Sequence, residues 1–172
     1  MEKIIFDRDA INRSLKRISH EILEKNQNLD DVVLVGIKTR GVFLAQRLSK
    51  LIQEFEGINI PSLALDVSKY RDDVTREIET NSKQSEVSLN AKSVIIVDDV
   101  LYTGRTVRAA MEAVLGYGRP KNVQFATLID RGHRELPIRA DYIGKNIPTS
   151  KLESVSVFLS EVDGEDSVII KI

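Results

Sequence analysis

One stretch near the middle of the chain, Val94 to Thr106, limits the possible folds more than any other. It opens with four apolar, mostly β-branched residues, Val94 to Val97, and such a run is typical of a strand buried on both faces of a parallel sheet. Two adjacent carboxylates follow, and a short turn then leads into an Ala-rich segment, Val107 to Leu115, that predicts a helix. The sequence therefore predicts an α/β protein.

The junction between this strand and this helix is suited to binding a phosphate group. In open α/β sheets, ligands bind at the carboxyl ends of strands, where the first N–H groups of the next helix can bind an anion. Gly104 allows a close approach of the backbone, Thr103 and Thr106 add hydroxyl donors, and Arg105 adds charge. The Walker A and dinucleotide-binding motifs are excluded because G-K-[ST] and G-x-G-x-x-G are missing.

A second strand–loop–helix unit lies earlier in the chain. Val32 to Val35 predicts another buried strand, and residues 42–52 carry the apolar spacing of a helix. The loop between them, Gly36 to Gly41, contains glycines and cations. A diphosphate would find backbone donors and positive charge there. The candidate residues are Lys38, Thr39, Arg40 and Gly41.

Residues 7–26 predict an amphipathic helix, because apolar residues recur on one face every three or four positions. The opposite face carries four residues that are cationic or can become so. They are Arg13, Lys16, Arg17 and His20. Such a face is often simply solvated, but the absence of acids within the cluster also fits a surface that binds a polyanion.

Residues 68–90 form a polar stretch without apolar periodicity. A stretch of this length inside a compact domain is usually functional or disordered. One interpretation is a flexible insertion. The other is a mobile hood, Val74 to Asn90, that closes over a substrate, with Tyr70 and Arg71 contacting phosphate.

The composition excludes several other kinds of site. With 25 basic and 26 acidic residues, net charge does not indicate nucleic-acid binding, so any basic site must be local. The absence of cysteine excludes disulfides and thiolate chemistry. The two histidines, His20 and His133, have no partner at metal-ligand spacing, so a histidine-based metal site is not expected.

The whole chain, residues 1–172, is expected to form one domain, because no repeat or second-domain boundary divides it. The expected remaining strands are residues 60–67, 122–129, 155–159 and 168–172, and residues 130–145 are expected to be basic and rich in loops. The first residues lack the apolar core of a signal peptide, and no run reaches membrane-spanning length. We therefore expect a cytoplasmic protein with no membrane partner.

Four segments resemble the PyrR family of pyrimidine operon regulators, which belongs to the type I phosphoribosyltransferases. They are residues 36–41, 70–73, 97–106 and 130–150. The resemblance implies the type I phosphoribosyltransferase fold, in which helices flank a central, mainly parallel sheet and a flexible hood loop covers the site. Members of the family bind pyr operon leader RNA to attenuate transcription and also act as uracil phosphoribosyltransferases.

The resemblance also implies ligands and roles. The expected small molecules are uracil, phosphoribosyl diphosphate (PRPP), UMP and UTP. Mg²⁺ is expected to bind through PRPP, near Asp98 and Asp99, rather than through protein side chains alone. In the superfamily the two acids hold the ribose hydroxyls, the Thr-rich turn holds the 5′-phosphate, and the loop after the first sheet strand binds pyrophosphate. A homodimer or higher homo-oligomer is also expected.

Three sets of site residues follow from these patterns and this resemblance. The expected catalytic residues are Asp98, Asp99 and Arg40. The expected PRPP- and UMP-binding residues are Lys38, Thr39, Arg40, Gly41, Tyr70, Arg71, Asp98, Asp99, Tyr102, Thr103, Gly104, Arg105 and Thr106. The expected RNA-binding residues are Arg13, Lys16, Arg17, His20, His133, Arg134, Arg139, Lys145 and Lys151.

The residues leave two other functions open. One is a regulator with weak or lost transferase activity, and the other is a base-salvage enzyme without an RNA role. The intact acid pair argues against the first, and the basic helix argues against the second. Purine-salvage relatives carry an acid, thought to be a general base, where Tyr102 stands here, so we expect a mechanism that depends on electrostatics rather than on a strong base.

Overall fold

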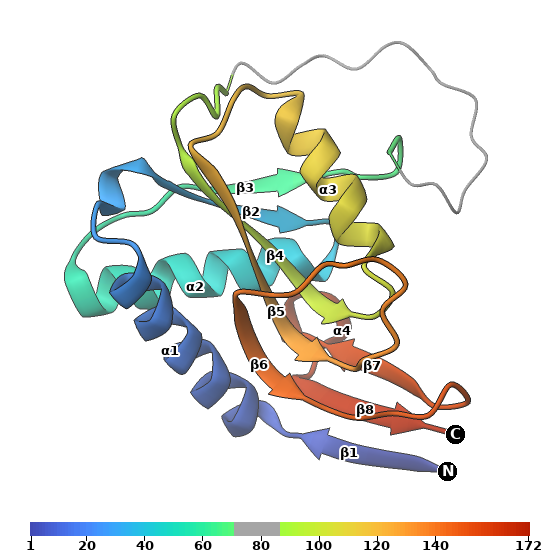
Figure 1. Cartoon of the computed structure of the whole chain (residues 1–172). Coiled ribbons are helices and arrows are strands. Elements are labelled where there is room, and N and C mark those ends of the chain that lie inside the picture. Colours follow the sequence, from blue (N-terminus) through green and yellow to red (C-terminus); the bar gives the residue numbers. More distant parts are fainter. Residues whose placement is uncertain (71–86) are drawn as a thin grey trace.

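A five-stranded parallel sheet forms the centre of the computed structural model, which describes residues 1–70 and 87–172. Its strand order is β3–β2–β4–β5–β6, and every neighbouring pair is parallel (Figure 1). The strands are β2 (Val32–Ile37), β3 (Ser62–Leu65), β4 (Ser93–Leu101), β5 (Asn122–Asp130) and β6 (Tyr142–Asn146). The predicted α/β class with a parallel sheet is confirmed.

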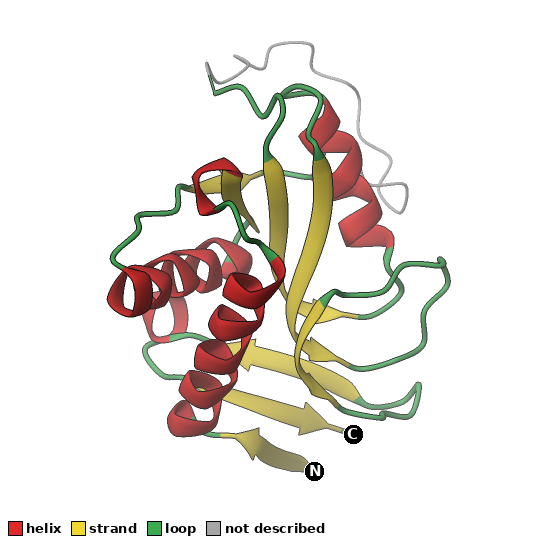
Figure 2. Cartoon of the chain, turned by 60° about the vertical axis from the view of Figure 1, so that its left-hand side comes forward, coloured by secondary structure: helices red, strands yellow, loops and turns green. Residues whose placement is uncertain are grey.

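Helices cover both faces of this sheet (Figure 2). On one face lie α1 (Arg8–Lys25) and α2 (Arg40–Glu56), and on the other lies α3 (Arg105–Leu115). Side chains of β2 alternate between the two cores, with Leu34 packing on the α1 and α2 side and Val35 on the α3 side. Every residue of β2 is buried, as its apolar, β-branched composition predicts.

The predicted amphipathic helix is α1. The carboxylate of Asp7 accepts a hydrogen bond of 2.8 Å from the N–H of Ala10, which caps the helix at its start. The four apolar residues that share a face, among them Ile11 and Ile22, are buried against the sheet and α2. Burial of this face turns the cationic side of the helix to solvent.

The last two predicted strands do not join the parallel sheet. They are β7 (Ser154–Phe158) and β8 (Ser167–Lys171), which form a separate antiparallel sheet with β1 (Glu2–Phe6), in the order β1–β8–β7. A four-residue helix, α4 (Ser160–Asp163), connects β7 to β8, and a 3-10 turn (Leu29–Asp31) precedes β2. The first and last strands of the chain therefore lie side by side (Figure 1).

The segment 130–145, expected to be rich in loops, also contains most of a strand that was not predicted, β6, which pairs with β5 over its whole length. Tyr142, the first residue of β6, is buried, and its hydroxyl donates a hydrogen bond of 2.5 Å to Gln124 of β5 and accepts one of 3.1 Å from Asn26. Burial, together with the nearby negative charges of Asp141 and Glu21, raises the pKa of Tyr142 to about 12, whereas the hydrogen bond with Asn26 acts to lower it. This network fixes β6 against β5 and the end of α1.

Most of the expected hood, residues 74–86, lies outside the described residues. Its last part does not fit the expectation, because Leu89 is buried in the α3 core. The N–H of Leu89 donates to the carbonyl of Tyr117, and the N–H of Ala91 donates to that of Arg119, both at 3.0 Å. Leu89 thus belongs to the packed body of the domain.

Among the described helices, none combines the length and the apolar character needed to cross a bilayer.

Candidate functional site

The acid pair lies in the second half of the central strand, β4. Asp98 and Asp99 follow four buried apolar residues in β4, and Asp98 itself is only 9% exposed. A carboxylate oxygen of Asp98 accepts a hydrogen bond of 2.9 Å from the N–H of Asp99, and Asp99 accepts one of 2.8 Å from Val100. These local bonds orient both carboxylates at the carboxyl end of the strand.

The turn after the acids forms a pocket at the start of α3. Gly104 has a φ of 92°, a left-handed conformation that favours glycine. The Thr103 hydroxyl accepts a hydrogen bond of 3.3 Å from the N–H of Arg105, and the Thr103 carbonyl accepts N–H groups of Glu135 and Leu136 at 2.9 and 3.2 Å. The cap residue, Gly104, makes no side-chain hydrogen bond to the first turn of α3, and the amino end of a helix favours an anion.

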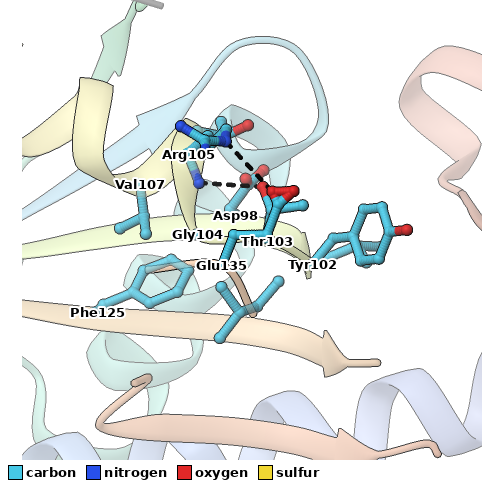
Figure 3. A pocket seen from close by; sticks show the side chains of 11 residues that line it. Asp98, Tyr102, Thr103, Gly104, Arg105, Val107, Phe125 and Glu135 are labelled. Atoms are coloured by element: carbon cyan, nitrogen blue, oxygen red, sulfur yellow. Dashed lines mark hydrogen bonds and ion pairs between the residues drawn. The ribbon is translucent and has the colours of Figure 1, made fainter. Parts of the chain in front are cut away.

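This pocket has a volume of about 370 Å³ and contains six of the thirteen residues predicted to bind PRPP and UMP (Figure 3). Those that line it are Asp98, Tyr102, Thr103, Gly104, Arg105 and Thr106. Glu135 also lines it, and its carboxylate lies 3.5 Å from Nε of Arg105. Sequence reasoning did not identify Glu135 as a pocket residue, because it lies far along the chain in a loop.

The second predicted loop lies directly against the acid pair. Lys38 and Thr39 are exposed, the peptide bond between them is cis, and α2 begins at the next residue. A Cβ atom at Gly41 would overlap the carbonyl oxygen of Val97 and lie 3.3 Å from Cα of Asp98. The structure therefore brings together two loops separated by about sixty residues of sequence, as expected for parallel neighbouring strands.

Arg40, at the start of α2, is held by a residue that sequence reasoning missed. Its Nε and Nη2 atoms donate to the two carboxylate oxygens of Asp163 at 3.2 and 2.7 Å. The hydrogen bond to Asp163 raises the pKa of Arg40, and the same bond lowers the pKa of Asp163. Nothing in the local sequence identifies this pair, because its members are 123 residues apart.

Tyr70 does not reach the phosphate turn. A Cβ atom at Gly116, at the carboxyl end of α3, would lie 3.6 Å from the Tyr70 hydroxyl, whereas the phosphate turn is at the amino end. Arg108 fixes the Tyr70 backbone by donating to its carbonyl at 2.5 Å. In this structure the Tyr70 hydroxyl therefore lies near the end of α3 opposite the phosphate turn. The other residue expected there, Arg71, lies outside the described residues.

Tyr102 forms one wall of the pocket and contacts two residues of the loop after β5. The guanidinium of Arg131 lies over its ring, and the ring of His133 meets it edge-on at a centroid distance of 6.2 Å. Arg131 is buried and donates to the carbonyl of Glu153 at 2.7 Å. Sequence reasoning missed Arg131, since a cation in a polar loop is ordinarily exposed.

The predicted cationic face of α1 is exposed, as expected. Lys145 of β6 joins it, because Arg13, Arg17 and Lys145 line one shallow depression beside Phe6. Arg17 also donates to the carbonyls of Ile143, at 3.1 Å, and Gly144. The guanidinium of Arg17 therefore links α1 to β6 in addition to presenting charge.

The other expected RNA-binding residues, His133, Arg134, Arg139 and Lys151, do not line the depression beside α1. His133 lies against Tyr102 at the pocket, and Arg134 forms an ion pair of 2.6 Å with Asp130 at the end of β5. Arg139 and Lys151 are exposed. On α1 itself, His20 stacks on Phe55 of α2, with ring centroids 4.3 Å apart. Of the expected RNA-binding residues beyond α1, Lys145 alone among the described residues shares this depression with the α1 cations.

No cluster of three or more His, Asp or Glu side chains that could hold a metal ion by itself occurs in residues 1–70 and 87–172. The two carboxylates at 98 and 99 nevertheless supply the oxygen donors that Mg²⁺ prefers. A magnesium site of the usual kind combines one or two such carboxylates with substrate phosphates and water. The donor set therefore fits a magnesium ion that arrives with a phosphorylated substrate.

Comparison with known proteins gives close relatives along the whole chain. The family model for the phosphoribosyl transferase domain matches residues 2–161. The chain is 54% identical over 170 residues to the bifunctional protein PyrR of Clostridium novyi, covering 97% of this chain and 96% of that protein. It is 51% identical over 173 residues to the bifunctional protein PyrR of Staphylococcus saprophyticus, covering 99% of each.

Solved structures with the same fold are more distant in sequence. A hypoxanthine phosphoribosyl transferase of Trypanosoma cruzi superposes with a TM-score of 0.76 at 19% identity, over 99% of this chain and 91% of that one. A hypoxanthine phosphoribosyltransferase of Staphylococcus aureus gives a TM-score of 0.74 at 23% identity, over 97% and 90% of the two chains. At these identities the comparison shows the fold alone.

Proposed function

The chain belongs to the phosphoribosyltransferase family and, within it, to the PyrR proteins, and on this basis we propose that it has two activities. It binds pyr operon leader mRNA to promote transcription attenuation, and it converts uracil and PRPP to UMP and pyrophosphate. The observation that carries this proposal is identity above 50% over nearly the full length of several proteins named bifunctional PyrR. A regulator without transferase activity is not favoured.

The phosphate turn is the proposed site of the 5′-phosphate of PRPP. The open amino end of α3 offers backbone N–H groups, and Thr103 and Thr106 line the same pocket with hydroxyl groups. Phosphates bind well at such helix ends because N–H groups and the helix dipole both favour negative charge. The left-handed φ of Gly104, a conformation that favours glycine, sets the course of the backbone into this helix end.

Asp98 and Asp99 are proposed to hold the ribose hydroxyls, and the loop from Lys38 to Gly41 is proposed to bind the diphosphate. The contact between Gly41 and the backbone of Val97 and Asp98 supports this arrangement, since it places the loop beside the acids. Lys38 and Arg40 supply positive charge for the leaving group. Mg²⁺ carried by PRPP would neutralise further charge on the diphosphate, with the two aspartates nearby as oxygen donors.

In the proposed reaction, N1 of uracil forms a bond with C1 of the ribose while the bond from C1 to the diphosphate oxygen breaks. The N1 proton is lost to solvent, and pyrophosphate takes the electron pair of the broken bond. Tyr102 lines the pocket as a neutral phenol, so this chain supplies no strong base at that position. Its contribution is to fix the two reactants and to stabilise the leaving charge.

The proposed RNA surface centres on the exposed cations of α1 together with Lys145. Positive side chains from α1 and β6 lie together there, an arrangement that suits the phosphate backbone of RNA. His133, Arg134, Arg139 and Lys151 remain proposed RNA contacts. We assign both activities to a single domain, residues 1–172, and propose a homodimer or larger homo-oligomer, which would extend the basic surface.

One paired experiment tests both activities. UMP formation from uracil and PRPP with Mg²⁺ is measured, and pyr leader RNA is titrated with and without UMP. We expect UMP formation, and RNA binding that tightens with UMP if the two sites are coupled, with reciprocal linkage. RNA binding without any UMP formation would leave only a regulator. UMP formation without RNA binding would leave only a salvage enzyme.

A further inference from the structure

Asp163 and Arg40 join the end of α4 to the start of α2. The pair is bidentate, with Nε of Arg40 at 3.2 Å from one carboxylate oxygen and Nη2 at 2.7 Å from the other. The Nε and Nη2 donors lie along one edge of the guanidinium, and their spacing matches that of the two oxygens of a carboxylate. Arg40 is also the third residue of the loop from Lys38 to Gly41, so the contact fixes a side chain of the proposed diphosphate loop.

The carboxylate of Asp163 is itself held in place. One of its oxygens accepts a second hydrogen bond, of 2.8 Å, from the N–H of Leu159, and its side chain is only 16% exposed. A neighbouring arginine of α2, Arg47, binds Glu161 and Asp166 on either side of Asp163, at 2.6 and 2.8 Å. The position of Asp163 is therefore set by the fold.

Arg40 also interacts electrostatically with the acid pair. The negative charge of Asp99 contributes to the raised pKa of Arg40, after the hydrogen bond and the charge of Asp163. The guanidinium thus lies within electrostatic range of the end of β4. A guanidinium carries five N–H donors, and the pair with Asp163 uses two of them, so donors remain for a ligand.

We propose that Asp163 is a positioning residue for the transferase reaction, which holds the Arg40 guanidinium in place so that its remaining N–H donors meet the diphosphate of PRPP. The proposal rests on the proposed function, because it takes the loop at 38–41 as the diphosphate site. A flexible arginine would lose side-chain freedom on binding, and a prepositioned one has lost it already. The alternative is that Asp163 competes with the diphosphate for Arg40. In that case, removing the charge of Asp163 would lower KM for PRPP, whereas positioning predicts that KM rises.

The test is Asp163→Asn in the full-length protein, with KM for PRPP, KM for uracil and kcat measured separately. The amide can still accept from the Leu159 N–H but loses the charge that holds Arg40. We expect KM for PRPP to rise about five- to tenfold, with KM for uracil within about twofold of the parent. Asp163→Glu keeps the charge and should give a smaller rise, which separates positioning from a general loss of fold.

Glu161→Gln is the matched control. It removes an ion pair between the same short helix and α2, but at Arg47 instead of Arg40. It should leave KM for PRPP unchanged. An equal rise in both variants would show that α4 packing alone matters and would overturn the proposal. A lower or unchanged KM for PRPP in Asp163→Asn would also overturn it, and a lower one would favour competition.

Direct binding of Mg²⁺-pyrophosphate, measured by calorimetry, separates this proposal from the proposed function. If the parent protein makes no UMP, the transferase assignment fails, yet the effect of Asp163→Asn on pyrophosphate affinity still decides the role of Asp163. In an Arg40→Gln background, Asp163→Asn should cause no further loss of affinity, because the two residues act as one unit. A full additional loss there would overturn the proposal.

Discussion

The guanidinium carbon of Arg131 lies 4.0 Å from the centroid of the Tyr102 ring. Tyr102 lines the pocket at the start of α3, and Arg131 follows β5, so the contact joins the carboxyl ends of two neighbouring strands. Arg131 also donates to the carbonyl of Glu153, just before β7. One buried cation thus connects the phosphate turn, the loop after β5 and the antiparallel sheet.

Replacing this cation should destabilise the protein. Arg131→Met would leave the Glu153 carbonyl without its charged donor, and we expect a loss of about 2–3 kcal/mol in the free energy of unfolding. Urea denaturation measures this loss. Arg119→Met, at an exposed arginine, is the control and should change stability by less than about 0.5 kcal/mol. Equal stability of the two variants would contradict the structural role of Arg131.

Neutralising the acid pair should remove most transferase activity. If Asp98 and Asp99 hold the ribose hydroxyls, each carboxylate bond contributes roughly 1.5–3 kcal/mol, so the double Asn variant should lose at least about tenfold in UMP formation. The control is an adjacent acid pair outside the site, Asp30 and Asp31, which precedes β2 at the opposite end of the sheet. Activity within twofold of the parent would mean that the ribose site lies elsewhere.

Gly104→Ala should reduce both stability and PRPP affinity. A φ of 92° is unfavourable for alanine by about 1–2 kcal/mol. The new methyl group would face Leu136 and Ile138, and relief of the strain would shift the backbone of the proposed phosphate turn. Gly57→Ala, at the end of α2, is a matched control, since its φ is 69° and nothing lies within 4 Å of a Cβ there. Both variants should lose stability, but only Gly104→Ala should raise KM for PRPP. A similar KM in both would count against the phosphate turn.

The basic face of α1 is best tested at Lys16 and Arg13, because Arg17 also bonds to the backbone of β6. Lys16→Gln should weaken leader-RNA binding and, if this lysine neutralises one phosphate, reduce the log–log salt slope by about 0.7 to 1. UMP formation should not change. Lys50→Gln, at an exposed lysine of α2, is the control. RNA affinity that is insensitive to both Lys16→Gln and Arg13→Gln would exclude this surface.

The ion pairs of α4 should make stability depend on acid pH. Hydrogen bonds from Arg47 and Arg40 lower the pKa values of Glu161 and Asp163. A lowered carboxyl pKa stabilises the fold above the unfolded value, near 4, and this stabilisation is lost as pH falls through the folded value. The urea midpoint of the parent should therefore decrease below about pH 4.5.

Asp163→Asn combined with Glu161→Gln should reduce this decrease of the urea midpoint at acid pH. The double variant should be less stable than the parent at pH 7, and the difference should shrink as the pH approaches about 3. Glu24→Gln, at an exposed glutamate of α1, serves as the control and should follow the parent. A difference between parent and double variant that is constant from pH 7 to 3 would show that charge at α4 does not stabilise the fold.

The central strand, α1 and the two loops could be predicted from the sequence, because each carries a local pattern. Val94 to Val97 is a continuous β-branched run, and the apolar residues of α1 repeat at helical spacing. The proximity of the two loops followed from the geometry of parallel strands, and the contact of Gly41 with Val97 agrees with it.

Other features depend on partners that the local sequence does not reveal. Residues 142–146 have a low propensity for a β-strand, because Gly144, Lys145 and Asn146 are all poor strand formers. Tertiary pairing with β5 overrides this local preference. A Cβ atom at Gly144 would overlap the carbonyl oxygen of Leu128, so this close strand contact requires a glycine. Asp163 looks like an ordinary turn residue until the fold places it against Arg40.

The pairing of β1 with β8 affects the order in which the protein can be completed during synthesis. Glu2 of β1 lies opposite Lys171 of β8, so their sequence separation spans almost the whole chain. The parallel sheet can assemble once β6 has left the ribosome, whereas β1 has no partner strand until residues 167–171 emerge. Until then the apolar side chains of Ile4 and Ile5 have no strand beside them, and a nascent chain stalled before residue 167 would expose that edge to chaperones or to other chains.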